Sequence, residues 1–118
     1  MDRETMQERT RLFAIRVVNL VRKLPKDTVS TVLARQLLRA ATSVGANYAE
    51  ASHASSRKHF ISTMEIAQRE ARETMYWLKL IIGLDLVSQK RLDPLLNECD
   101  ELVAIFTKSI VTAKKRHD

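Results

Sequence analysis

Apolar and small side chains recur at alternating intervals of four and three residues along the chain, a spacing that predicts amphipathic helices. The first such row consists of Met6, Thr10, Phe13, Val17, Leu20 and Leu24. Pro25 has no N–H to donate and disfavours helix at the residue before it, so we expect this helix to span about residues 4–23. Asp27 or Thr28 is suited to cap the next helix by accepting a backbone N–H.

Three more rows follow. They predict helices over about residues 29–52, 56–84 and 90–114, with Ser55 or Ser56 capping the third helix and Ser88 the fourth. The second row is Leu33, Leu37, Ala41, Val44, Tyr48 and Ala51; the third is Phe60, Met64, Ala67, Ala71, Thr74, Leu78 and Ile81; the fourth is Leu92, Leu95, Leu96, Cys99, Leu102, Val103, Phe106, Ile110 and Ala113. In the second helix Ala41, Gly45 and Ala49 lie four residues apart on one face. Such small side chains favour tight packing in the bundle, with a ligand against the glycine as the alternative.

Short connections force successive helices to run antiparallel. The predicted fold is therefore all-α, an up-and-down antiparallel four-helix bundle formed by a single domain, residues 1–118. The composition agrees, because the 118 residues include only 2 Gly and 2 Pro. A lone cysteine, Cys99, excludes an internal disulfide and a cysteine-based zinc site.

The chain begins with charged residues rather than the apolar segment of a signal peptide. The longest uninterrupted apolar stretch, residues 80–84, is far shorter than the ~20 residues that span a bilayer. We therefore expect a cytoplasmic protein with no membrane partner.

Positive charge is concentrated in the first half of the chain. The net charge is +6, and residues 1–58 hold 11 basic and 5 acidic side chains. The candidate nucleic-acid-binding residues are Arg9, Arg16, Lys23, Arg35, Arg39, Arg57 and Lys58. The alternatives are a solvated basic surface and a surface that binds phosphates with little sequence preference.

Glu70 and Glu73 interrupt a second apolar stripe of the third helix, from Ile66 to Leu84, and Asn47 and Glu50 lie one turn apart beside the small-residue face of the second helix. Asn47, Glu50, Glu70 and Glu73 are candidates for a buried polar network. Arg39, Arg69 and Arg72 are the cations available to pair with the carboxylates, and a ligand or partner site is the alternative.

Near the end of the third helix, apolar side chains occupy almost the whole circumference of the helix, which suggests self-association. The candidate interface residues are Met75, Trp77, Leu80 and Ile82.

An enzyme is not indicated. Glu50 and His53 have the Glu-x-x-His spacing of di-iron bundles, but that chemistry needs a second such motif, which the sequence lacks. Cys99 lies in an apolar row and no Ser/His/Asp set stands out, so we expect no catalytic residue, metal or cofactor.

The middle of the chain resembles a known bacterial family. The residues that carry the resemblance are 36–51 (QLLRAATSVGANYAEA), 56–61 (SRKHFI) and 67–78 (AQREARETMYWL), within a match over about residues 12–110. They are similar to the four helix bundle protein family, also called 23S rRNA intervening-sequence proteins, which includes the accessory variability determinant of diversity-generating retroelements. The resemblance implies an up-and-down bundle that assembles as a homopentamer and carries no assigned enzyme activity. In the retroelement branch it implies binding to a reverse transcriptase and to nucleic acid.

Residues and resemblance together predict a non-enzymatic, homo-oligomeric bundle that binds RNA or DNA through a basic surface, as an accessory to a protein partner such as a reverse transcriptase. The alternative is a protein-interaction scaffold that binds no nucleic acid and uses its charge for solubility.

Overall fold

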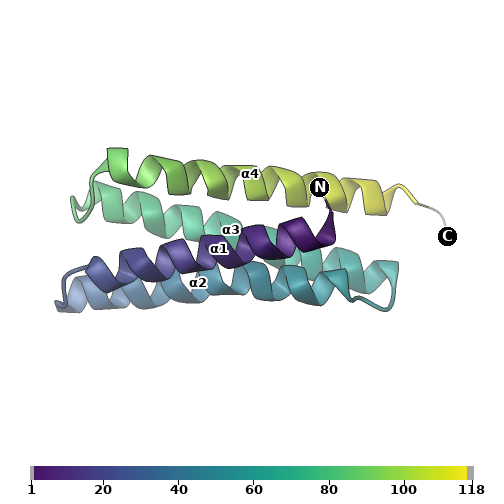
Figure 1. Ribbon diagram of the computed structural model, residues 1–118, viewed down its shortest axis with the longest axis horizontal. Helices are drawn as coiled ribbons and strands as arrows, with labels where there is room; N and C mark the ends of the chain where they lie inside the picture. Colours follow the sequence, from purple (N-terminus) through teal and green to yellow (C-terminus); the bar gives the residue numbers. More distant parts are fainter. Residues whose placement is uncertain (1, 117–118) are drawn as a thin grey trace.

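The computed structural model describes residues 2–116 and contains four helices: α1 (Arg3–Lys23), α2 (Thr28–Ser52), α3 (Arg57–Gly83) and α4 (Gln89–Lys114). Successive helices run in opposite directions along the 52 Å long axis of the molecule (Figure 1). The predicted all-α, up-and-down four-helix bundle is confirmed. Each predicted helix end lies within one residue of the observed end.

Each helix begins at a side chain that accepts a hydrogen bond from the backbone N–H three residues later. The capping residues are Asp2, Asp27, Ser56 and Ser88. A side-chain oxygen in this position satisfies one of the N–H groups that the first turn leaves without a helical partner. The predicted caps at Asp27, Ser56 and Ser88 are therefore confirmed.

The end of α3 contains a residue with left-handed backbone geometry. Asp85 has a φ of 57°, and its N–H bonds the carbonyl of Ile82 while the N–H of Leu86 bonds the carbonyl of Ile81. This pair of bonds is the Schellman motif, which satisfies the last carbonyls of a helix and usually places Gly or Asn where Asp85 lies. The motif turns the chain sharply into α4.

The four predicted apolar rows meet along the axis of the bundle. Its largest fully buried side chains include Phe13, Leu37, Met64, Leu78 and Phe106, so every helix contributes to the core. Cys99 is buried among them and donates a weak hydrogen bond from Sγ to the carbonyl of Ala71 at 3.5 Å. Burial raises the pKa of the Cys99 thiol to about 12, so this cysteine is a packing residue rather than a nucleophile.

The small residues of α2 allow α1 to approach closely. A Cβ atom added to Gly45 would lie 3.1 Å from Thr10 Oγ1 and 3.2 Å from Thr10 Cβ. Thr10 is buried, and its hydroxyl donates to the carbonyls of Met6 at 3.0 Å and Gln7 at 3.1 Å, which holds the side chain in place. Gly45 is therefore explained by helix packing.

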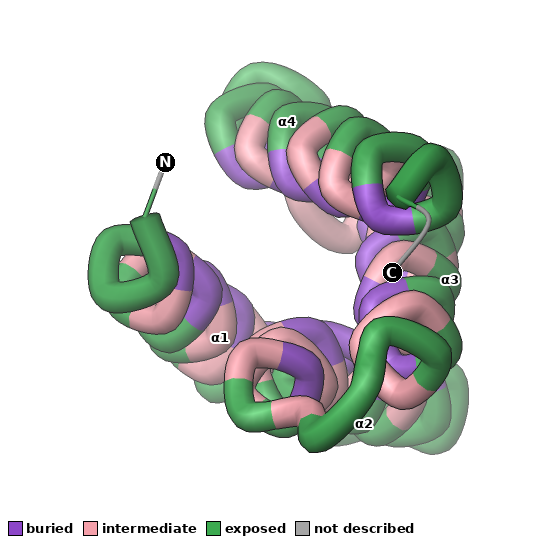
Figure 2. Tube along the Cα trace, turned by 90° about the vertical axis from the view of Figure 1, so that its right-hand side faces the viewer, coloured by how far each residue is buried: buried purple, intermediate pink, exposed green. Residues whose placement is uncertain are grey.

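The bundle is less closed on one side than on the others. α2 packs against α1 and α3, and α3 packs against α4, whereas α1 and α4 approach each other over a short stretch. Figure 2 shows α1 and α4 diverging at the end that carries the first turn of α1.

We expect Gly45→Leu to destabilise the protein because its side chain would push α1 away from α2. Overpacking of this kind lowers the free energy of unfolding by about 1–3 kcal/mol. The matched control is Gly83→Leu, since nothing lies within 4 Å of a Cβ at Gly83. Urea denaturation followed by circular dichroism measures both variants. Equal stability of the two would contradict the close contact.

Candidate nucleic-acid interface

Arg39 joins α2 to the polar row of α3. Its guanidinium donates from Nη1 to Glu70 Oε2 at 3.2 Å and from Nη2 to Glu73. Glu73 also accepts a hydrogen bond from Trp77 Nε1 at 3.2 Å. Because Glu70 is only 8% exposed, its carboxylate depends on Arg39 for a charged partner. Of the three cations expected to pair with this row, Arg39 is the one that does so.

The structure corrects the expectation for the other two members of the predicted network. Asn47 is half-buried and donates from its amide to the carbonyl of Ser43 in its own helix at 2.8 Å. Glu50 is exposed, and its carboxylate lies 3.8 Å from His59 Nε2. Both residues lie on the flank of α2 beside its buried row, where water reaches them, so neither joins Glu70 and Glu73.

Arg9 connects α1 to α4. Its guanidinium binds Glu98 through two bonds, both 2.7 Å, and Glu101 through a third at 3.1 Å. These bonds raise the pKa of Arg9 further above its ordinary value. Its side chain is 20% exposed, so this cation serves helix packing and presents little charge to a ligand.

The remaining candidate cations lie at two opposite ends of the bundle. Arg16, Lys23 and Arg35 are exposed near the α1–α2 connection, and within residues 2–116 none of them forms an ion pair. Arg57 and Lys58 are exposed at the start of α3, at the other end. The seven predicted residues therefore do not form one surface.

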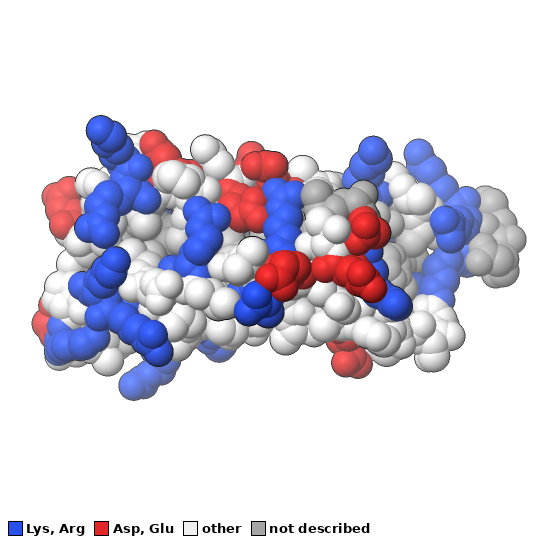
Figure 3. Space-filling view, in the orientation of Figure 1, with Lys and Arg blue, Asp and Glu red and all other residues white. Residues whose placement is uncertain are grey.

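A denser group of cations occupies the end where α1 and α3 finish and α2 and α4 begin. We call this region, residues 16–35 and 76–94, the basic end. It holds eight Lys or Arg and three Asp, a net charge of +5 out of the +6 of the whole chain. All eight cations are exposed, and among the described residues none has an ion-pair partner: Arg16, Arg22, Lys23, Lys26, Arg35, Lys79, Lys90 and Arg91. Figure 3 shows Lys and Arg side chains predominating over this end, with acidic side chains gathered near the middle.

Sequence reasoning did not single out Arg22, Lys26, Lys79, Lys90 or Arg91. The last three are separated along the chain from the basic first half, and the charge balance of the second half is even. The antiparallel topology was the signal that would have found them, because it brings the start of α4 beside the ends of α1 and α3.

An apolar patch lies within the same end. The Arg39–Glu73 ion pair fixes the register of the antiparallel helices α2 and α3. Counting the same number of residues away from this pair along each helix places Val32 beside Leu80 and Val29 beside Gly83. The side chains of Val29, Val32, Tyr76 and Leu84 are between 48% and 58% exposed, which is unusual for large apolar residues. We call these four residues, with Trp77 and Leu80, the α2–α3 patch.

The four candidate interface residues divide between two faces of α3. Trp77 and Leu80 are half-buried on the side of Glu73 and belong to the α2–α3 patch. Met75 and Ile82 follow Gln68 at intervals of seven residues, and Gln68 Nε2 donates to Thr107 of α4 at 2.6 Å. They therefore face α4, where they pack against the core as partly buried side chains.

Comparisons with known proteins agree with this architecture. The sequence model of the family described as 23S rRNA-intervening sequence protein matches residues 3–108. The chain belongs to this family. A crystal structure of a Bacteroides thetaiotaomicron protein of unknown function, from the S23 ribosomal protein family, is 34% identical to this intervening-sequence protein. The similarity covers 93% of this chain and 98% of that one, with a TM-score of 0.86. A search of curated proteins gives no significant match.

Two other features are absent from the described part of this intervening-sequence protein: a metal-ligand cluster and a membrane-spanning helix. Among residues 2–116 no group of three or more His, Cys, Asp and Glu side chains is arranged to hold a metal ion. None of the helices in that range combines the length and apolar character needed to cross a membrane.

We expect Arg39→Ala to lower the stability of the intervening-sequence protein because it leaves Glu70 buried without its partner. The loss is about 1–2 kcal/mol, less than for a fully buried pair because Arg39 itself is half-exposed. Arg35→Ala is the matched control one turn away, where no ion pair is lost, and it leaves the urea midpoint unchanged. A midpoint for Arg39→Ala equal to that of Arg35→Ala would refute this role.

Proposed function

We propose that this protein is a non-enzymatic, homo-oligomeric bundle that binds nucleic acid, RNA or DNA, through its basic end. The observation that carries the proposal is the group of eight exposed cations without ion pairs. Paired cations are already neutralised by the protein, as Arg9 and Arg39 are. Unpaired cations repel one another, and a bound polyanion reduces that repulsion. Binding also releases the counterions that surround the polyanion, which favours the complex.

Contacts to phosphates account for such binding better than contacts to bases. Phe13 and Phe106 are buried, and Tyr48 stacks on Phe106 with ring centres 6.0 Å apart. Tyr76, which is 58% exposed, is the aromatic side chain at the basic end that is most accessible to a base. Binding would therefore be strongly salt-dependent and weakly sequence-dependent.

Self-association rests on the α2–α3 patch. Exposed apolar side chains on two adjacent helices favour a second copy of the chain or another protein, because contact removes them from water. The patch lies within the basic end, so an oligomer formed through it gathers several basic ends on one particle and strengthens its attraction for a polyanion. A protein partner, such as the reverse transcriptase suggested by the family resemblance, would use the same kind of surface.

The alternative function is a protein-interaction scaffold in which the charge only provides solubility. The α2–α3 patch favours this alternative as much as it favours oligomerisation, since an apolar surface serves either partner. Nucleic-acid binding separates the two functions.

We expect Lys23→Glu/Arg35→Glu to weaken binding to a blunt, unphosphorylated 20-base-pair RNA or DNA duplex by about tenfold or more, because two phosphate contacts become repulsions. Lys58→Glu/Lys115→Glu is the matched control. It changes the net charge equally at the opposite end, at two exposed residues that form no ion pair with any other residue in the range 2–116. Fluorescence anisotropy at several salt concentrations measures both affinities. Equal losses in the two variants, or no binding by the wild type at low salt, would overturn the proposal.

We expect light scattering to give the wild-type protein a mass several times 13.5 kDa at micromolar concentration. Val32→Glu/Leu84→Glu, in the α2–α3 patch, reduces that mass because it places charge in the interface. Leu12→Glu/Ile15→Glu is the matched control on α1, where the two side chains are 46% and 41% exposed. A wild-type monomer, or dissociation only in the control, would contradict an interface at this patch.

A further inference from the structure

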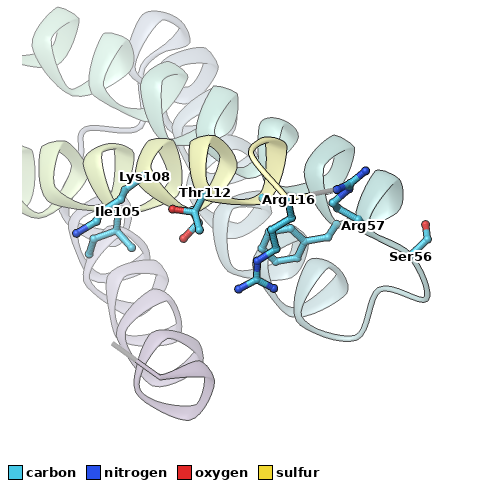
Figure 4. A pocket seen from close by; sticks show the side chains of 9 residues that line it. Ser56, Arg57, Ile105, Lys108, Thr112 and Arg116 are labelled. Carbon is cyan, nitrogen blue, oxygen red and sulfur yellow. The ribbon is translucent and has the colours of Figure 1, made fainter. Parts of the chain in front are cut away.

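A groove lies between the start of α3 and the end of α4. Its volume is about 820 Å³, within the range of small-molecule sites. The residues that line it are Ser56, Arg57, Phe60, Ile105, Lys108, Ser109, Thr112, Ala113 and Arg116. Figure 4 shows Thr112 near the end of α4, Arg116 just beyond it and Arg57 on the first turn of α3. We call it the α3–α4 groove.

The register of α1 against α4 explains why this groove is open. Arg9 pairs with Glu98 and Glu101, so in antiparallel helices Arg3 is level with residues 104–107. Helix α1 begins at Arg3, capped by Asp2, while α4 continues to Lys114. The last two turns of α4 therefore extend past the first turn of α1, and no helix of this chain covers the groove there.

The lining combines three kinds of surface. Three cations, Arg57, Lys108 and Arg116, lie along the groove, and no Asp or Glu is among the described residues that line it. Phe60, Ile105 and Ala113 supply apolar surface. Hydroxyl groups come from Ser56, Ser109 and Thr112.

This combination favours a phosphorylated ligand with a flat, partly polar body. Lys108 and Arg116 suit a terminal phosphate, which carries close to two negative charges at pH 7, better than a single carboxylate. The aromatic ring and the methyl groups suit the face of a base, whereas an acyl chain would leave the hydroxyls of Ser109 and Thr112 without partners.

We propose that the α3–α4 groove binds a nucleoside phosphate, either free or at the end of an unpaired strand. The site lies at the opposite end of the bundle from the basic end and does not depend on the function proposed above. A groove of this size holds one or two nucleotides, so it recognises an end and not a length of duplex.

Calorimetric titration with four probes tests the proposal. The probes are adenosine 5′-monophosphate, adenosine, and a five-nucleotide single strand with and without a 5′-phosphate. We expect the phosphorylated member of at least one pair to bind more than tenfold more tightly than its unphosphorylated counterpart. Preference confined to the mononucleotide identifies a free nucleotide as ligand, and preference confined to the strand identifies a strand end. Absence of a phosphate preference in both pairs overturns the proposal.

Three variants locate the site. Lys108→Glu/Arg116→Glu is expected to weaken binding of the preferred probe more than tenfold, and Thr112→Trp is expected to do so by filling the groove without changing its charge. Arg69→Glu/Arg72→Glu, on the middle of α3 and outside both the groove and the basic end, is the matched control and is expected to change this affinity less than twofold. All five residues are exposed, so the folds are retained, which circular dichroism verifies. Equal losses in the groove and control variants, or wild-type affinity in Thr112→Trp, would refute the site. Duplex binding is read separately with the blunt, unphosphorylated probe, so failure here leaves the basic end intact.

Discussion

The shortness of the three connections is the constraint on which the surface of this protein depends. The connections are residues 24–27, 53–56 and 84–88. Each is only long enough to reverse the direction of the chain, so each helix packs antiparallel to the one before it. Segments far apart in sequence therefore share an end of the molecule. The basic end, the α2–α3 patch and the α3–α4 groove are each assembled from helix termini that only this topology brings together.

The sequence predicted the features that depend on neighbouring residues. Helix bounds follow from the apolar rows and from local signals such as Pro25, which ends α1, and Ser88, which caps α4. Burial of Cys99 followed from its place in the row of α4. These features need no knowledge of which helices meet, because an amphipathic helix with a capping side chain is encoded within one segment.

Features that depend on register between helices could not be predicted. A sequence gives no distance between Arg9 and Glu98, or between Arg39 and Glu70, yet these pairs remove two cations from the predicted binding surface. Glu50 and Glu70 both lie in or beside apolar rows, but of the two only Glu70 is buried in the structure. The charge of the basic end was likewise hidden, because its members alternate between the basic and the balanced halves of the chain.

The weak attachment of α1 to α4 bears on how the molecule fluctuates. Helix α1 rests on α2 along the contact at Gly45, whereas its other flank is held chiefly by the Arg9 pairs. Helix α3 packs against both α2 and α4 independently of α1. Detachment of α1 therefore breaks fewer contacts than unfolding of the whole chain. We expect the backbone amides of α1 to be the least protected from hydrogen exchange. Release of α1 would expose Phe13 and Val17 and the apolar row of α2 that they cover. Helix α1 of a second copy of the chain could pack on that row in the same way.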